Sequence, residues 1–497
     1  MKKSFVKIPV AALLLLFTVQ VKAQSSSDYY VQGNGNRMAA EWEPALGTLI
    51  TWPLCIPYKL AVELAKDDHL YVLVDNDSTK KDARQWFHKW GIKENTVTFI
   101  FARQGIDAWW VRDWGPGAIF NKSKKMQLAD GKYIYSTPVS NMGCSDTLMF
   151  LYTTTDNKII KTETDDSLTL AVGKGLNIPV LDLPFITTGG NVISDGLGNA
   201  FSTCILLNEN KFYGVGEDRF FKLNNELAGL RNYHIISNFE HRGIQHIDCY
   251  MKLLDEERLL VCEPPADHAL YPVYQNIIDN ELSKLTSAYG RPYEILRIKS
   301  DRYKGQALAA YTNSIIINKT IYVPLFHIRQ DSLALERWRE VMPGYTIKGF
   351  EYALADEPVV SEKIKEQYKV YGWNNGDALH CRTRAIWDDA MLFMSVKRID
   401  KEVDEKNSNT VHASIIDYSN KGLVKNKAAV LWRIAGEKNW KRIALQQDGN
   451  ENNFSATIPF HKKGAVVEYY VTASSRSGKT ATMPRTAPLG VYTFSIK

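Results

Sequence analysis

Short apolar runs bounded by polar or turn residues recur from about residue 48 to residue 398, and each is typical of a β-strand. Two stretches between them, 56–68 and 275–290, instead have the apolar spacing of amphipathic helices. The second carries its apolar residues on one face up to Leu285, and we expect Gly290 to act as its C-terminal cap. Interspersed strands and helices predict a mixed α/β body. The strand-like runs include 48–52, 69–75, 96–102, 294–300 and 392–398.

Two tight turns predict hairpins within this body. Asp195-Gly196 lies between the apolar runs of 189–207, and Asn318-Lys319 lies between those of 313–325. Asp-Gly and similar pairs favour the turns that join antiparallel strands. We therefore expect much of the strand pairing to be antiparallel.

The pattern changes near residue 400. The charged stretch 397–409 lacks the apolar residues needed to pack, and it predicts a linker at 401–410. The pattern that follows predicts a small immunoglobulin-like β-sandwich over 411–497, after a main domain over 24–400. Its alternating strands, with no convincing helix among them, are 428–434, 454–459, 465–475 and 491–496.

The first residues predict a signal peptide over 1–23. Three early lysines precede an apolar stretch, Ile8 to Phe17, that is too short to span a bilayer. Val21 and Ala23 supply the small side chains of a cleavage site, so we expect an exported protein, periplasmic or secreted. Removing the four lysines of this segment lowers the formal net charge from +6 to +2. The remaining charge gives no reason to expect a nucleic-acid partner or a membrane span.

The six cysteines are sparse for a chain of 497 residues, so a packed core and not a disulfide framework must hold the fold. No C-x-x-C pair occurs, which argues against a zinc site. The sequence leaves open whether any disulfide forms. The cysteines are Cys55, Cys144, Cys204, Cys249, Cys262 and Cys381.

Polar residues gather inside otherwise apolar runs at four places, where burying them is costly unless they serve a purpose. In a strand, His246 and Asp248 would point to one face, with Ile247 turned to the core. Asp113 would lie at a strand end beside the flat ring of Trp110, although a simple buried ion pair with its neighbour Arg112 is an alternative. The four stretches are 109–117, 246–248, 311–314 and 378–381.

Cys381 is the candidate nucleophile among these residues. If 379–381 is extended, His380 points away from the thiol and is a poor base for it. His246, already beside a carboxylate, is therefore the candidate partner. An inert buried thiol is the alternative for an isolated cysteine.

Two carboxylates beside a thiol narrow the chemistry. Asp113 and Asp248 would raise the thiol pKa and oppose the oxyanion of acyl transfer, which argues against a cysteine protease. They suit a planar cation such as guanidinium, which binds carboxylates in a bidentate manner and whose charge favours the thiolate. Attack on its central carbon would let His246 protonate departing ammonia and then activate water.

These motifs together resemble the guanidine-modifying deiminases, and most closely the bacterial, Porphyromonas-type peptidylarginine deiminase and agmatine deiminase group. The resemblance covers roughly residues 38–400 and implies a five-bladed α/β propeller (pentein) catalytic domain with no metal or other cofactor. The motifs are "EWEPALGTLITWP" (41–53), "WVRDWGP" (110–116), "GGN" (189–191), "HID" (246–248), "YTNS" (311–314) and "GDALHCRT" (376–383).

The resemblance also implies roles for single residues. It makes Cys381 the nucleophile and His246 the acid and base, while Asp113 and Asp248 hold the guanidinium. Residues expected to line the substrate pocket are Trp110, Arg112, Asn191 and Asn313.

The substrate is less constrained than the reaction. Thr137 and Val139 stand where the Porphyromonas enzyme carries arginines that grip a C-terminal arginine, so that selectivity is in doubt. Predicted export favours arginine side chains in peptides as the substrate. Agmatine deimination, giving N-carbamoylputrescine, is the alternative within the class. A non-catalytic arginine-binding or peptide-binding protein is the alternative from another class.

Overall fold

The computed structural model describes most of the chain, and the predicted signal peptide, Thr137 and Cys144 lie outside the described residues. No helix among the residues that the structure describes is both long and apolar enough to cross a membrane. The described residues are 28–30, 32, 35–106, 109–134, 138–139, 149–150, 163–240, 244–352, 360–365, 372–373, 376–404, 409–459 and 461–497.

Five sheets of the described main body share one pairing pattern. In each, a first strand pairs antiparallel with a second, and the second pairs parallel with a third. The predicted hairpins are confirmed, but a parallel pair follows each of them. In this order the strands are β5 (Gly117–Phe120), β6 (Met126–Lys132) and β9 (Val180–Ile186); β10 (Ile193–Ser194), β11 (Asn199–Thr203) and β12 (Asn232–Ile236); β13 (Met251–Leu253), β14 (Arg258–Glu263) and β15 (Glu294–Lys299); β18 (Ile315–Ile317), β19 (Thr320–Leu325) and β20 (Thr346–Glu351); and β21 (Arg384–Trp387), β2 (Ala45–Thr51) and β3 (His69–Val74), extended by β4 (Val97–Phe101).

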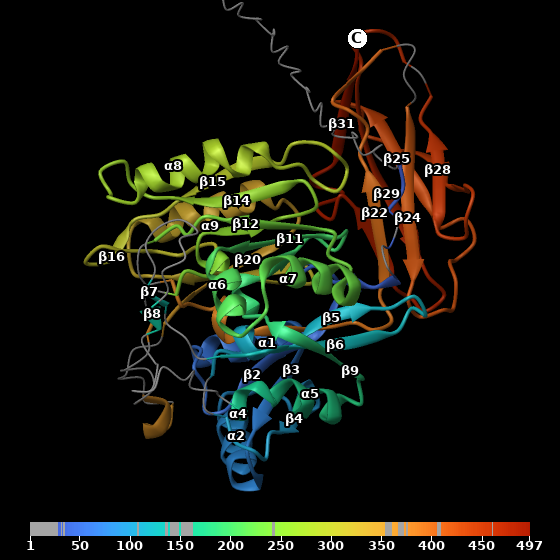
Figure 1. The fold of residues 1–497 in the computed structure, drawn as a ribbon. Coiled ribbons are helices and arrows are strands. Elements are labelled where there is room, and N and C mark those ends of the chain that lie inside the picture. Colours follow the sequence, from blue (N-terminus) through green and yellow to red (C-terminus); the bar gives the residue numbers. More distant parts are fainter. Residues whose placement is uncertain are drawn as a thin grey trace, which may run out of the picture.

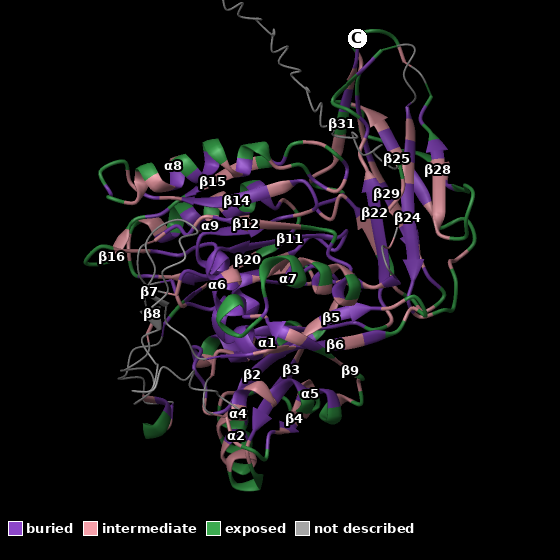
Figure 2. Cartoon of the chain, viewed as in Figure 1, coloured by how far each residue is buried: buried purple, intermediate pink, exposed green. Residues whose placement is uncertain are grey.

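Helices connect the parallel strands, because a parallel pair needs a crossover connection. The helix predicted at 56–68 is confirmed, and it buries Leu60 and Leu64 against the sheet that it follows. The outer faces of the connecting helices are exposed, as on α2 and α8 (Figure 2). The helices are α1 (Tyr58–Asp67), α2 (Asp77–Lys89), α5 (Leu168–Leu176), α6 (Ile205–Phe212), α7 (Glu217–Leu223), α8 (Tyr271–Asn280) and α9 (Gln330–Val341).

The helix predicted at 275–290 is wrong at both ends. It begins at Tyr271, with a proline in its first turn, and it ends at Asn280. Gly290 has a φ of +77° and belongs to a tight turn, in which its N–H donates to the carbonyl of Ser287. The buried Leu282 that continued the helical pattern instead packs from a separate 3₁₀ turn.

Two mostly antiparallel sheets follow the main body and enclose one hydrophobic cluster (Figure 1). All four strands predicted after residue 428 are present. Leu392–Lys397, which the sequence analysis placed in the main domain, pairs with these C-terminal sheets instead. The strands are β22 (Leu392–Lys397), β24 (Thr410–Asp417), β28 (Asn453–Thr457) and β27 (Gln446–Gln447) in one sheet, and β23 (Glu402–Val403), β31 (Tyr492–Ile496), β29 (Val466–Ser474), β25 (Ala429–Ile434), β26 (Lys441–Ala444) and β30 (Thr480–Met483) in the other.

A buried arginine joins the main body to the C-terminal sheets. Arg37 pairs with Glu43 at 2.6 Å, and its guanidinium lies 4.1 Å from the ring centroid of Phe393 in β22. Its Nε also donates to the Tyr418 hydroxyl at 3.0 Å. The ion pair and these two aromatic contacts satisfy a charge that would otherwise be costly to bury.

Candidate active site

Five short segments, each directly before the first strand of one of the five sheets, carry the candidate residues. Each segment contacts the next, so that the five are arranged in a ring. α3 contacts η3, and η3 contacts η5. Thr312 is hydrogen-bonded to η5, Asn313 is hydrogen-bonded to η7, and η7 contacts α3. Residues distant along the chain therefore converge on one place. The segments are α3 (Val111–Trp114), η3 (Gly189–Asn191), η5 (Ile247–Cys249), 311–314 and η7 (His380–Arg382).

Three local structures differ from the expectations. Asp113 lies in the short helix α3 and not at a strand end. His246 and Asp248 flank the start of the 3₁₀ turn η5 and not a strand, because the N–H of Ile247 turns aside to donate to Asn191 Oδ1 at 3.0 Å. Cys381 likewise lies in a 3₁₀ turn, so the extended backbone assumed for 379–381 is wrong.

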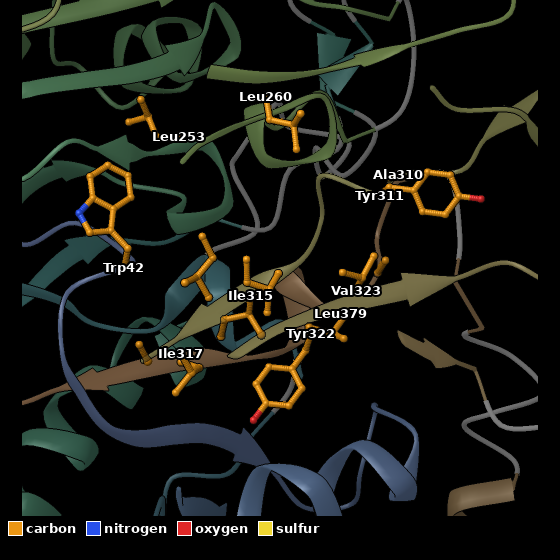
Figure 3. Packing of buried hydrophobic residues seen from close by; sticks show 14 of the residues in the cluster. Trp42, Leu253, Leu260, Ala310, Tyr311, Ile315, Ile317, Tyr322, Val323 and Leu379 are labelled. Atoms are coloured by element: carbon orange, nitrogen blue, oxygen red, sulfur yellow. The ribbon is translucent and has the colours of Figure 1, made fainter. Parts of the chain in front are cut away.

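The residues flanking the site are anchored in the hydrophobic core. Figure 3 shows Ile315 and Ile317 of β18 packed in the same cluster as Leu379, which precedes η7. All three side chains are almost fully buried. The turn that carries Cys381 is therefore held by apolar packing on its N-terminal side.

Asp113, His246 and Asp248 meet around Gly190. A Cβ atom at Gly190 would lie 2.6 Å from Asp113 Oδ1, and 3.1 Å from both Asp248 Oδ2 and His246 Nδ1. The N–H of Gly190 donates to Asp113 Oδ1 at 3.1 Å. Cys381 Sγ lies 3.7 Å from Asp248 Oδ2, so the structure brings all four predicted catalytic residues together.

The imidazole of His246 is poised to carry a proton. Burial lowers its pKa, but Asp113, whose Oδ1 is 3.5 Å from Nδ1, together with Asp248 and Glu209, raises the pKa to about 9. The ring is 5% exposed. At neutral pH His246 is therefore an imidazolium, which can act as a general acid.

The thiol of Cys381 is held in its protonated form. A hydrogen bond with Cys249 lowers its pKa, but burial and the charges of Asp248, Asp377 and Asp113 raise the pKa to about 12. A cation bound between the two aspartates would reverse this electrostatic effect.

Two asparagines fix the turns that carry these groups. Asn313 Oδ1 accepts from the N–H groups of Ala378 at 3.2 Å and His380 at 3.0 Å, and its Nδ2 donates to Cys381 Sγ at 3.2 Å. Asn191 Oδ1 accepts from Thr203 as well as from η5. The structure thus gives both asparagines a positioning role that the sequence did not predict.

The remaining two predicted pocket residues face other partners. Trp110 donates through Nε1 to Asp377 at 3.1 Å and stacks obliquely near Trp109. Arg112 is buried, donates to the carbonyl of His380 at 3.2 Å and lies 3.5 Å from Glu41. Arg112 therefore supports the turn η7 from behind, and its positive charge is unsuited to binding a second guanidinium.

A charged group behind the site was not predicted from the sequence. His380 Nδ1 lies 2.6 Å from Asp248 Oδ2, and its Nε2 contacts Glu41. Lys252 pairs with Glu41 at 2.8 Å. Glu41, Lys252 and His380, together with Arg112 and Arg384, border a cavity of about 60 Å³. Glu41 and His380 stand inside the quoted motifs, which was the available signal, whereas nothing marked Lys252.

The cysteines among the described residues are of two kinds. Cys204 is disulfide-bonded. Cys55, Cys249, Cys262 and Cys381 are free and buried. Cys249 adjoins Cys381, so a second thiol lies at the candidate nucleophile.

Comparisons with known proteins place the chain among hydrolases that act on the C–N bonds of guanidino groups. A model of the Porphyromonas-type peptidyl-arginine deiminase family matches residues 37–354, so the chain belongs to this family. The matched range ends before Cys381. A curated relative from Mycoplasma mycoides subsp. mycoides, described as "Putative agmatine deiminase", is 22% identical over 266 residues, which are 48% of this chain and 68% of the relative.

Solved structures of agmatine deiminases share the mixed α/β fold. The enzyme of Enterococcus faecalis has a TM-score of 0.53 at 18% identity, covering 73% of this chain and 100% of that one. A cysteine-to-serine variant of the C. jejuni enzyme with substrate bound has a TM-score of 0.53 at 17% identity, covering 71% of this chain and 96% of that one. At this identity the likeness shows the fold.

Proposed function

We propose that this protein is exported and converts arginine side chains of peptides into citrulline and ammonia. The observation that carries the proposal is the meeting of two carboxylates and an imidazolium around Gly190, with the Cys381 thiol 3.7 Å from one of these carboxylates. Carboxylates on two sides of one point suit a planar cation and oppose the oxyanion of amide hydrolysis. A protein that only bound arginine would need no nucleophile there.

The reaction begins with the guanidinium bound between Asp113 and Asp248. Its positive charge offsets the carboxylates that raise the pKa of Cys381, so the thiol releases its proton to solvent and becomes the thiolate. The sulfur then forms a bond to the central guanidinium carbon, which becomes tetrahedral. His246 gives its proton to one amino nitrogen, and the C–N bond to that nitrogen breaks to release ammonia.

The second half of the reaction regenerates the thiol. Neutral His246 accepts a proton from water as the oxygen adds to the carbon of the thiouronium intermediate. The C–S bond then breaks, sulfur leaves with the electron pair, and the carbon retains oxygen as a ureido group. Cys381 and His246 return to their starting protonation states after proton exchange with solvent.

The architecture supports this assignment. The five sheets share one pairing pattern, and the segments before their first strands contact one another around a ring. We propose that the sheets are the blades of a pentein propeller with the site at its axis. The C-terminal sheets form a separate immunoglobulin-like domain, which begins at β22 and not after a linker at 401–410.

Agmatine is the second candidate substrate, and the names of the Enterococcus, C. jejuni and Mycoplasma relatives favour it. Predicted export favours peptidyl arginine, because agmatine is mainly an intracellular metabolite. The two candidates differ in what is attached to the guanidino group, and not in the chemistry at Cys381.

A colorimetric assay for ureido groups tests the proposal. Purified protein is incubated with agmatine, free arginine, a peptide with an internal arginine and a peptide ending in arginine. We expect the internal-arginine peptide to react fastest, and Cys381→Ala to abolish the product while Cys262→Ala, which removes another buried thiol, retains activity. Agmatine as the fastest substrate would replace the peptidyl assignment, and no product from any of the four would overturn deimination.

A further inference from the structure

Cys249 is a thiol at the active site that the deimination mechanism does not use. It directly follows Asp248 and is 2% exposed. Its Sγ lies 3.6 Å from Asp248 Oδ1 and 3.4 Å from the carbonyl oxygen of Gly376. A buried second sulfur beside the nucleophile requires an explanation of its own.

The two sulfurs and the carboxylate have the spacing of metal ligands. The ligand atoms of Asp248, Cys249 and Cys381 all lie within 4.8 Å of one another. Cys249 Sγ lies 3.6 Å from Asp248 Oδ1, and Cys381 Sγ lies 3.7 Å from the other carboxylate oxygen, Oδ2. Tetrahedral zinc, with bonds of about 2.3 Å to sulfur and about 2.1 Å to oxygen, places such ligand pairs roughly 3.6 Å apart. The three ligand atoms, which lie within 4.8 Å of one another, would therefore have to draw together until one carboxylate oxygen reaches this distance from both sulfurs.

The surroundings also suit two sulfur ligands. Asn313 Nδ2 lies 3.2 Å from Cys381 Sγ and 3.8 Å from Cys249 Sγ, so one N–H donor faces both sulfurs. Asp248 is itself oriented by His380 at 2.6 Å. Outer partners of this kind orient the ligands of metal sites.

We propose that Asp248, Cys249 and Cys381 form an inhibitory site for a soft divalent cation such as Zn²⁺ or Cd²⁺. The cation binds the carboxylate and two thiolates, and the two thiol protons pass to solvent, so no oxidant or reductant takes part. Bound metal takes both the nucleophile and one of the two carboxylates that hold the guanidinium. The inhibition is therefore competitive with substrate. This inference rests on the proposed function and differs from a resident cofactor, which the reaction does not require.

Cadmium binding can be measured without any enzymatic activity. CdCl₂ is titrated into the full-length chain, purified without oxygen and without a reductant so that the Cys204 disulfide stays intact, while the ultraviolet absorbance of cadmium–thiolate bonds is followed. We expect one strongly bound Cd²⁺ per chain, with the absorbance of two thiolates. Cys249→Ala and Cys381→Ala should each lose this signal, whereas Cys262→Ala, the matched variant at a buried thiol outside the cluster, should keep it.

Inhibition supplies the second measurement. ZnCl₂ should inhibit the wild type competitively with substrate, and Cys249→Ala should raise the inhibition constant at least about tenfold, because loss of a mere outer partner of a metal site already costs that much. Equal cadmium absorbance in the Cys249→Ala and Cys262→Ala variants, or none in the wild type, would overturn the site. A cadmium signal in a protein without deiminase activity would support the site and remove the proposed function instead.

Discussion

His246 and His380 both interact electrostatically with Asp248, and the charges around them shift their pKa values in opposite directions. Asp113, Asp248 and Glu209 overcome burial and raise the pKa of His246 to about 9. Burial lowers the pKa of His380, and Arg112 and Lys252 lower it further against the pull of Glu41 and Asp248. Both rings are almost fully buried. The difference between the two pKa values therefore comes from the charges nearest to each ring more than from burial.

The two rings also differ in which nitrogen atoms are engaged. Nδ1 of His380 faces Asp248 and Nε2 contacts Glu41, so both nitrogens are occupied within the protein. His246 Nδ1 lies at the longer distance of 3.5 Å from Asp113. A general acid must hand its proton to the substrate, which His380 cannot do while both nitrogens are held. The comparison teaches that contact with the shared carboxylate does not identify the acid.

Among the changes that test this difference between the two histidines, replacing His246 should have the largest effect on activity. Because His246→Gln removes the general acid and base, we expect kcat to fall by about 10²- to 10⁴-fold. Steady-state kinetics with the best substrate of the panel measure the loss, and circular dichroism checks that the variant is folded. A loss smaller than that of His380→Gln would reverse the roles of the two rings.

Replacing His380 should cost less. His380→Gln cannot bridge Asp248 and Glu41 in the same way, so Asp248 loses its orientation, and we expect kcat/KM to fall about 10- to 100-fold. The pH dependence of the residual activity should keep the shape of the wild type, because the titrating acid remains. A shift of the pH at which the profile levels off would show that His380 itself transfers protons.

The pH profile should reveal the raised pKa of His246. A raised pKa means that the imidazolium persists below about pH 9 and is lost as the pH rises through that value. Formation of the Cys381 thiolate, whose pKa is about 12 in the free protein, raises kcat/KM by about tenfold per pH unit, and above pH 9 the loss of the imidazolium cancels this gain. We therefore expect kcat/KM to rise up to about pH 9 and to level off above it. The profile is recorded with a guanidino substrate, whose own charge is constant over this range. A plateau that begins near the ordinary histidine value of about 6.5 would contradict the effect of Asp113.

Removing the positive charge of Lys252, near His380, should have the smallest effect on activity. Lys252→Met takes away a positive charge that lowers the pKa of His380, so the pKa of this ring should rise while that of His246 stays in place. Carbon-13 NMR titration of labelled histidines separates the two rings, with the His380→Gln variant giving the assignment. An equal shift at both rings would indicate a general structural change. Activity should change less than in His380→Gln.

Much of the fold followed from local patterns. The strand at 69–75 and the turn at Asn318-Lys319 are present, because alternation and turn residues act over a few neighbouring positions. The helix predicted to end at Gly290 failed since continued apolar spacing does not show whether Leu282 packs from a helix or from a turn. The strand expected at His246 failed because Asn191, over fifty positions away, bends the backbone there.

The candidate site divides in the same way into features that local sequence predicts and features that depend on tertiary contacts. The sequence by itself determined the thiol, the imidazole and the two carboxylates, because motifs of a few residues carry those types. Only the tertiary structure showed that Lys252 and Glu41 stand behind His380, and that Cys249 and Cys381 share a donor. Hydrogen bonds and electrostatic effects depend on distance through space and not along the chain. Which histidine holds its proton, and which thiols act together, were therefore decided where the five segments meet.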